Sequence, residues 1–287
     1  MIDLHTHSTY SDGTDDVINI LKKAEKLHLE VLSITDHNTC AAYKELETLN
    51  IAEHFSGKII NGIELSTHAL NIPIEILGYK YNSKILEPEL KKLYLTPEER
   101  NKIELSRLFE KAKLAGIDIN ENAINEYKSD IFASKFFHNI IRKNIDNKKL
   151  IDEDAWNDNN VFYRKYMSNP STPFYVETSD ILPDISTLIN LIHEANGLVF
   201  LPHIFEYNIN SLNILNHILT TYKIDGIECF YTTFSNEQNK YLLNICKEKN
   251  LFVSGGSDFH GSYKPNVNLG TGFGTLNISK KYVENWI

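Results

Sequence analysis

The sequence predicts an α/β fold, in which a parallel sheet with helical crossovers is interrupted by a helical insert. Two observations support this prediction. Short apolar runs alternate with helical patterns in residues 1–95 and 177–287, and seven strand-like runs can be counted, a number close to that of a closed barrel. Residues 96–176 contain helical patterns without strand-like runs, so they are expected to form an inserted helical subdomain.

Residues 1–95 are expected to form the first part of the barrel. The predicted elements, in order, are a strand at 1–7, a helix at 15–29, a strand at 31–37, a helix at 41–55, and strands at 58–65 and 73–81. In the first helix, Val17, Ile20 and Leu21 fall on one face, which is typical of a helix that packs on a sheet.

The insert begins with a helix that is expected to start at Pro97 and to end near Gly116. It contains 13 basic and 13 acidic residues, so the rest of the chain carries the whole net charge of −9. All four arginines of the chain lie in the insert. If a guanidinium group binds a substrate phosphate, Arg100 at the start of this helix is the candidate. The alternative is that Arg100 is a solvated charge on a helix face.

Residues 177–287 are expected to complete the barrel. The predicted elements are a helix at 185–197, a strand at 198–203, a helix at 211–222, a strand at 226–231, a helix at 236–250 and a strand at 251–260. This order repeats the alternation that is typical of parallel strands joined by helices.

Composition excludes several classes of protein. The net charge of −9 argues against stable binding of duplex nucleic acid. No start like that of a signal peptide is present, and no apolar run approaches the ~18 residues of a membrane span, so a cytoplasmic protein is expected. Cys40, Cys229 and Cys246 are too few and too scattered for a disulfide framework, and we expect them to be buried.

Histidines and carboxylates recur at the ends of the predicted strands. His5 and His7 lie two residues apart on the first strand, so their side chains point to the same face. The full set is His5, His7, Asp12, His37, Glu64, Glu75, His203, Asp258 and His260. All of these except Glu75 are expected at the carboxyl end of a strand or just after it, where barrel enzymes build their active sites.

Each of these residues alone has a simpler explanation. Asp12 could cap the helix that follows it, and Glu75 could pair with Lys80. The complete set is difficult to explain by packing, because buried charged groups are unfavourable unless they are paired or coordinate a metal. His68 and His138 could belong to either class, and we leave both out of the predicted metal site.

The mixture of imidazole and carboxylate donors suits divalent ions such as Mn²⁺, Fe²⁺ or Zn²⁺. Carboxylates that bridge ions would allow the set to hold two or three of them. Such ions would polarise a phosphoryl oxygen and supply a metal-bound hydroxide as the nucleophile. The sequence therefore predicts a metal-dependent phosphatase or phosphodiesterase. The alternative from another class is a binding module that retains the metals without turnover.

The motifs DLHTHSTYSDG, SITDH, NGIELS, PH and GGSDFHG resemble, in their order and spacing, the polymerase and histidinol phosphatase (PHP) family. The resemblance covers the barrel and implies a distorted seven-stranded (β/α) barrel with a di- or trinuclear metal site and phosphoesterase activity. By position, it implies a first metal held by His5, His7, Glu64 and Asp258, a second by Asp12, His37 and His260, and a third by Glu64, His203 and Glu75. Many members of the family have histidine at this last position.

The insert and the run DGIECFYTTFSNEQNKYLLNICKEKNLFVSGGSDFHG look most like one branch of the family. That branch dephosphorylates nucleoside 3′,5′-bisphosphates or trims short RNA from its 5′ end. The resemblance thus implies a nucleotide, a short RNA or another small phosphorylated metabolite as substrate, and hydrolysis of a phosphomonoester as the reaction. A histidinol-phosphate phosphatase is the alternative within the same class.

Overall fold

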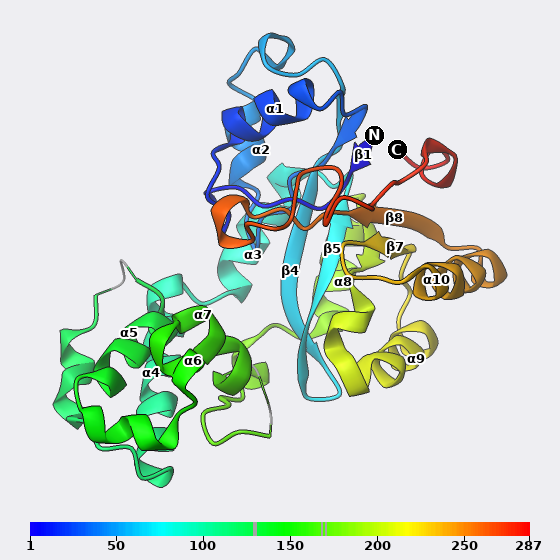
Figure 1. Ribbon diagram of the computed structural model, residues 1–287. Helices are drawn as coiled ribbons and strands as arrows, with labels where there is room; N and C mark the ends of the chain where they lie inside the picture. Colours follow the sequence, from blue (N-terminus) through cyan, green and yellow to red (C-terminus); the bar gives the residue numbers. More distant parts are fainter. Residues whose placement is uncertain (129–130, 168, 170) are drawn as a thin grey trace. The chain divides into compact units, whose positions relative to one another are not determined.

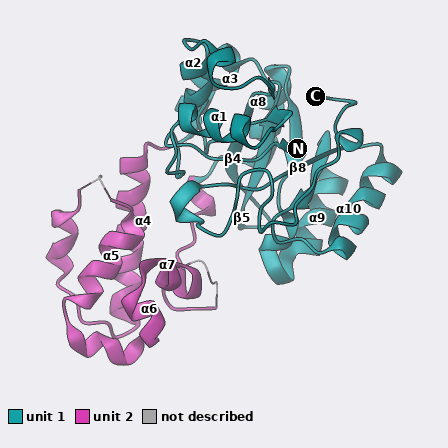
Figure 2. Cartoon of the chain, turned by 45° about the horizontal axis from the view of Figure 1, so that its top comes forward, with its two compact units in different colours: residues 1–94, 182–287 teal, residues 95–181 magenta. Residues whose placement is uncertain are grey.

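The computed structural model describes residues 1–128, 131–167, 169 and 171–287 (Figure 1). These residues form two compact units (Figure 2). The first consists of residues 1–94 and 182–287, and the second of residues 95–181. Every strand of the described residues lies in the first unit, and the second unit is helical. No helix among the described residues is both long enough and apolar enough to span a membrane.

Three short parallel strands begin the first unit. They are β1 (Ile2–Asp3), β2 (Val31–Leu32) and β3 (Lys58–Ile59), paired in the order β1-β2-β3. The helices α1 (Val17–Lys26) and α2 (Ala41–Leu46) connect them, and a 3-10 helix (Ile51–Glu53) precedes β3. Helix α1 begins at its cap, Asp16, whose carboxylate accepts a hydrogen bond from the N–H of Asn19.

A second sheet contains five strands in the order β4-β5-β6-β7-β8. They are β4 (Gly62–Ala69), β5 (Ile72–Tyr79), β6 (Leu198–Leu201), β7 (Gly226–Tyr231) and β8 (Phe252–Gly256). The prediction of a wholly parallel sheet is wrong at β5, which is antiparallel to both β4 and β6. The reason is a tight hairpin between β4 and β5, in which Leu70 and Asn71 both adopt positive φ, as a type I′ turn requires.

The predicted distorted seven-stranded barrel is not confirmed, because the described residues form eight strands in two sheets that are not closed. The predicted strand at 58–65 is divided into β3 and the start of β4. Local contacts nevertheless connect the two sheets. The N–H of Leu4 donates to the carbonyl of Gly255 at 3.1 Å, and isolated bridges join Thr6 to Phe259 and His37 to Glu64. The α/β class itself is confirmed.

Four longer helices belong to the same unit. They are α3 (Ser83–Leu93), α8 (Ile185–Glu194), α9 (Ser211–Thr221) and α10 (Asn236–Lys249). Shorter 3-10 helices lie at Ile204–Asn210, Gly261–Tyr263 and Lys280–Tyr282. Helix α8 packs against β4 and β6, and α10 packs against β7 and β8. The aromatic rings of Tyr79 and Phe200 lie in the buried core, with their centroids 5.1 Å apart.

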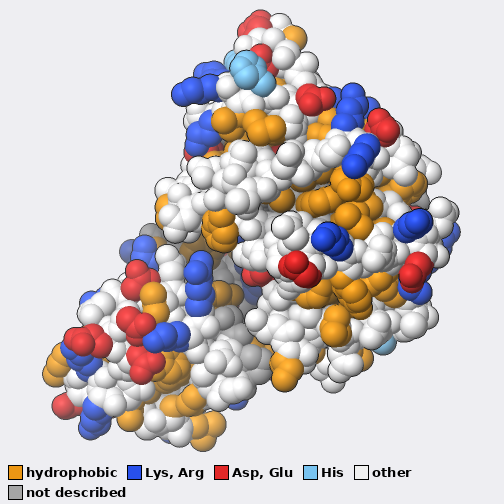
Figure 3. All heavy atoms as spheres, turned by 45° about the vertical axis from the view of Figure 1, so that its right-hand side comes forward, with side chains coloured by type: hydrophobic (Ala, Val, Ile, Leu, Met, Phe, Trp, Pro, Cys, Tyr) orange, Lys and Arg blue, Asp and Glu red, His pale blue; other side chains and the backbone are white. Residues whose placement is uncertain are grey.

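The second unit is built around an aromatic core that includes Phe109, Phe137 and Phe162. Its helices are α4 (Pro97–Leu114), α5 (Ala133–Arg142), α6 (Glu153–Asn157) and α7 (Asn159–Phe162), with 3-10 helices at Glu121–Glu126, Ile145–Leu150 and Ser179–Ile181 and a π-helix at Tyr163–Met167. A capping box of Thr96 and Glu99 starts α4. Acidic and basic side chains are interspersed on the face shown in Figure 3.

Candidate metal centre

The nine predicted residues lie together, and we call them the cluster. Six of them are buried, namely His5, His7, Glu64, His203, Asp258 and His260, whereas Asp12, His37 and Glu75 are partly exposed. Three sets of donor atoms have all members within 4.8 Å of one another: His7, Asp12, His37 and His260; His5, His7 and Glu64; and His37, Glu64 and Glu75. The cluster thus offers several adjacent positions that could hold a divalent ion.

Glu64 lies at the centre of the cluster. Its Oε2 is 3.2 Å from the Nε2 atoms of both His5 and His7 and 3.4 Å from Nδ1 of His37. Its Oε1 accepts a hydrogen bond from Nε2 of His203 at 2.8 Å. The two oxygens therefore face different histidines, as expected of a carboxylate that could bridge ions. Glu64 is the third residue of β4, so the expectation that it ends a strand is wrong.

Asp258 and His260 follow β8 and lie close to His5 and His7, which follow β1. Oδ1 of Asp258 is 3.2 Å from Nε2 of His7 and 3.3 Å from Nδ1 of His260. The same Nδ1 lies 2.9 Å from the carbonyl of Asp258. If it donates its proton there, Nε2 of His260 keeps a free lone pair toward Asp12, 3.2 Å away. Asp12 does not cap α1, because Asp16 does so.

Glu75 reaches the cluster from β5. It lies opposite Ser66 in the β4–β5 hairpin and on the same face as Glu64. Its carboxylate oxygens are 3.5 Å from Nδ1 of His37 and 3.3 Å from Nε2 of His203. The alternative partner Lys80 instead donates to the carbonyl of Trp286. The pairing of Glu75 with Lys80 is therefore not what the structure contains.

The charges of the cluster favour cations. Burial alone would lower the pKa of His7, but its contacts with Asp258 and Glu64 raise this pKa to about 10. Burial would raise the pKa of Asp12, yet its contact with His260 and the nearby His37 hold it below its usual range. Positive charge in the cluster is thus stabilised by the carboxylates, and a divalent cation would experience the same field.

Unpartnered atoms give a second test of whether metals fit. Seven buried side-chain nitrogen or oxygen atoms of the described residues lack a hydrogen-bond partner, and four of them belong to the cluster: Nε2 of His7, Oδ1 of Asp12, Nδ1 of His37 and Nδ1 of His203. Buried polar atoms are normally satisfied, so a concentration of exceptions in one place requires an explanation. The donor types and the unpartnered atoms both fit bound divalent ions.

Residues 3–159 match the family model of the PHP domain. The chain belongs to the PHP family. The matched segment covers more than half of the chain and contains the cluster residues from His5 to Glu75. Together with the relatives described next, this match identifies the chain as a metal-dependent phosphoesterase, a hydrolase of phosphoester bonds.

Curated relatives of this PHP chain act on phosphoesters, as their names state. A 5′-3′ exoribonuclease from Haemophilus influenzae is 25% identical over 264 residues, which is 90% of this chain and 89% of the relative. A 3′,5′-nucleoside bisphosphate phosphatase from Chromobacterium violaceum is also 25% identical over 264 residues, 90% of this chain and 87% of the relative. Both alignments extend beyond the segment that matches the family model.

Solved structures share the fold of this PHP chain. One is a protein from Bifidobacterium adolescentis that is provisionally named a metal-dependent phosphoesterase. The two structures superpose with a TM-score of 0.68 at 22% identity, and the aligned region is 94% of this chain and 90% of the other chain. Another is a protein from Chromobacterium violaceum that is named an amidohydrolase and was solved with sulfate and no metal. The TM-score is 0.69 at 23% identity, and the aligned region is 94% of this chain and 89% of the other chain.

Two carboxylates that accept hydrogen bonds from the cluster or from the loop that carries Asp12 were not predicted from the sequence. Glu228 on β7 is fully buried, lies 3.0 Å from Nδ1 of His5 and accepts the backbone N–H of His203 at 2.8 Å. Asp36 accepts hydrogen bonds from Ser8 and Ser11, which hold the loop that carries Asp12. An acidic residue inside the apolar run GIECFY was the available signal for Glu228, because a buried carboxylate requires a partner.

The backbone around the cluster has two residues with positive φ and one close approach that requires glycine. Asp258 and His203 adopt positive φ values of 58° and 21°, a conformation that is uncommon for residues other than glycine. Gly256 lies against His5, because a Cβ atom at this glycine would be 2.3 Å from Cβ of His5. Only glycine allows β8 to approach the backbone of His5 this closely.

The other residues that the sequence analysis considered for a functional role lie outside the cluster. His68 is on β4, where its backbone bridges to Asp184. His138 is buried in the second unit, and its Nε2 is 2.9 Å from the carbonyl of Ala155. Arg100 is exposed on α4 in the second unit, and its role in binding phosphate stays a prediction. The three cysteines are buried, as expected.

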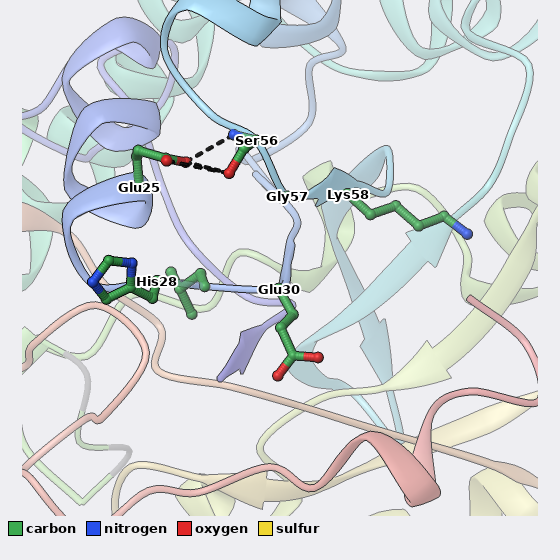
Figure 4. A pocket seen from close by; sticks show the side chains of 7 residues that line it. Glu25, His28, Glu30, Ser56, Gly57 and Lys58 are labelled. Atoms are coloured by element: carbon green, nitrogen blue, oxygen red, sulfur yellow. Dashed lines mark hydrogen bonds between the residues drawn. The ribbon is translucent and has the colours of Figure 1, made fainter.

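A surface hollow of about 410 Å³ lies elsewhere on the first unit (Figure 4). It is lined by Glu25, His28, Leu29, Glu30, Ser56, Gly57 and Lys58. Glu30 and Lys58 lie at the amino ends of β2 and β3, whereas His37 follows the carboxyl end of β2. The hollow therefore lies at the opposite ends of these strands from His37. The carboxylate of Glu25 is already occupied by the N–H and hydroxyl of Ser56.

Proposed function

We propose that this enzyme hydrolyses a phosphomonoester of a nucleotide or of another small phosphorylated metabolite, with two or three divalent cations held by the cluster. The observation that carries the proposal is the convergence of nine donor residues, seven of which belong to the three compact donor sets and four of which contribute buried atoms without hydrogen-bond partners. Packing alone gives no reason for such a set, because apolar side chains would fill the same space without the cost of removing charged groups from water.

The cation positions follow from the three sets of donor atoms. His7 and Asp12, with His37 and His260, would hold one ion, and Glu64 would contribute to the neighbouring positions. Mn²⁺, Fe²⁺ and Zn²⁺ all suit this mixture of nitrogen and oxygen donors. When bound, such ions supply Lewis acidity, which offsets charge on a phosphoryl oxygen and makes water a better nucleophile near neutral pH.

The side chains of the protein orient these positions. An ionised carboxylate can only accept hydrogen bonds, so we expect Nδ1 of His5 to donate its proton to Glu228. The lone pair of Nε2 then remains available to coordinate an ion. Nδ1 of His260 is occupied in the same way by the carbonyl of Asp258. Because Asp12, His37 and Glu75 are the partly exposed members, substrate is expected to approach the cluster from their side.

The substrate class rests on the relatives. The named exoribonuclease and the named nucleoside bisphosphate phosphatase both act on nucleotide phosphoesters, and each covers 90% of this chain. A nucleotide or a short RNA with a terminal phosphate is therefore the first substrate to test. In the second unit, the guanidinium of Arg100 is proposed to contribute to phosphate binding.

The test is a screen for phosphate release by the full chain. The protein would be stripped with a chelator and reloaded separately with Mn²⁺, Fe²⁺ and Zn²⁺. The substrates would be adenosine 3′,5′-bisphosphate, a 5′-phosphorylated RNA oligonucleotide and histidinol phosphate. We expect release from the bisphosphate or the oligonucleotide that depends on the added metal. Turnover of histidinol phosphate alone, or metal binding without turnover of any substrate, would contradict the proposal.

A further inference from the structure

Lys264 lies at the edge of the cluster and contacts one of its carboxylates. Its ammonium donates to Oδ2 of Asp258, and the hydroxyl of Tyr231 donates to the same oxygen at 2.7 Å. The other oxygen of Asp258 faces His7 at 3.2 Å. The two oxygens of this carboxylate are thus divided between the cluster and Lys264, whose side chain is 32% exposed.

The loop that carries Lys264 is fixed against the loop after β1. The N–H of Ser262 donates to Oγ1 of Thr14 at 2.8 Å, and the N–H of Thr14 donates to the carbonyl of His260 at 3.2 Å. Gly261 has a φ of 64°, and a Cβ atom there would be 2.1 Å from Oγ1 of Thr14. Only glycine permits this approach, so Lys264 is held beside the cluster by the chain itself.

Lys264 lies beside carboxylates of the cluster, which stabilise its ammonium. A lysine is positively charged at neutral pH, and this one is also within electrostatic range of Glu64 and Asp12. Divalent ions in the cluster would repel its ammonium, because like charges at short range destabilise each other. A phosphate dianion beside the ions would remove this repulsion. Lysine binds phosphate as a compact point charge with three donors.

We propose that Lys264 binds the phosphate group of the substrate and so determines that the cluster accepts phosphorylated dianions. This inference rests on the proposed function and adds a substrate-binding residue to it. Tyr231 would continue to orient Asp258 when the ammonium turns toward the phosphate, because its hydroxyl holds the same oxygen.

The experiment measures binding of inorganic phosphate to the metal-loaded full chain by titration calorimetry. Lys264→Met removes the charge and retains the length of the side chain, and Lys264→Arg restores a cation. Lys44→Met is the matched control, since Lys44 pairs with the buried Glu87 away from the cluster. We expect Lys264→Met to weaken phosphate binding by about 10- to 100-fold, as for loss of a hydrogen bond to a charged group. Lys264→Arg should recover most of the affinity.

Metal content by elemental analysis separates this role from a structural one. The inference requires Lys264→Met to keep the metal content of the wild type while it loses phosphate affinity. It is overturned if phosphate affinity is unchanged, if it falls only because metal is lost, or if Lys44→Met has the same effect. In all three cases the proposed function still holds if the wild type hydrolyses phosphoesters. A wild type that neither binds metal nor turns over a phosphoester would instead contradict the proposed function.

Discussion

Glu228 accepts a hydrogen bond from the imidazole of His5 across a distance of 3.0 Å, and this contact directs Nε2 of His5 toward Glu64. A carboxylate behind a metal-binding histidine fixes the tautomer and the orientation of the ring. Glu228 also accepts the N–H of His203, so one buried side chain orients two members of the cluster.

The first prediction follows from this arrangement. Glu228→Gln should lower metal affinity by about 10- to 100-fold, because an amide can accept from only one of the two partners through its oxygen. Metal titration followed by calorimetry measures the effect, and circular dichroism checks that the fold is kept. Equal affinities in the variant and the wild type would show that Glu228 is only a packing residue.

The second prediction concerns Glu75, which lies between His37 and His203. Glu75→Gln should lose about one metal ion per chain, because a neutral amide is a weaker ligand than a carboxylate. Glu75→His should recover the ion and shift preference toward Zn²⁺, since imidazole is the softer donor. Elemental analysis of each variant measures this, with Glu206→Gln as a control for an exposed glutamate. The same stoichiometry in all of them would exclude Glu75 as a ligand.

The third prediction concerns Arg100 in the second unit. Arg100→Ala should raise KM for phosphorylated substrates by about tenfold without lowering metal content, as expected when a substrate contact is lost. Arg142→Ala removes an exposed arginine of α5 and should leave KM unchanged. If both variants behave as the wild type, Arg100 is a solvated charge on the surface of α4.

The fourth prediction is a pH dependence of the second unit. Burial lowers the pKa of His138 below its ordinary value of 6.5. As the pH falls through about 6.5, the unfolded chain binds a proton that the folded chain does not, so the free energy of unfolding of this unit should decrease. Hydrogen exchange of the α5 amides, corrected for intrinsic rates, should therefore accelerate from pH 7 to pH 5 more in the wild type than in His138→Gln. The opposite order would contradict a lowered pKa.

The sequence was sufficient to predict where most of the cluster lies along the chain. His5, His7, His37, His203, Asp258 and His260 all follow strands that the apolar runs predicted. Strands β1 and β2 are parallel neighbours, so their carboxyl ends lie at the same edge of the sheet. The histidines that follow these two strands therefore lie next to one another. That these residues bind metal stays a prediction.

Other features depend on contacts that the local sequence does not encode. The division between β3 and β4 is an exception, because Asn61 and Gly62 interrupt the apolar run from Lys58 to Leu65 and are a turn signal that the prediction of one strand did not use. The turn at Leu70 and Asn71 lacks glycine, which hid the antiparallel hairpin. Lys264 lies in a loop whose position depends on Thr14, 250 residues earlier in the sequence.

The central claim is that the cluster holds divalent cations that the hydrolysis requires. The most direct measurement is the number of metal ions per chain in the wild type and in His7→Ala, measured together with phosphate release from adenosine 3′,5′-bisphosphate. His193→Ala is the matched control, because it removes a histidine that pairs with Asp225 outside the cluster. The account predicts two or three ions and turnover in the wild type and the control, with fewer ions and almost no turnover in His7→Ala. Normal metal content and normal turnover in His7→Ala would contradict it.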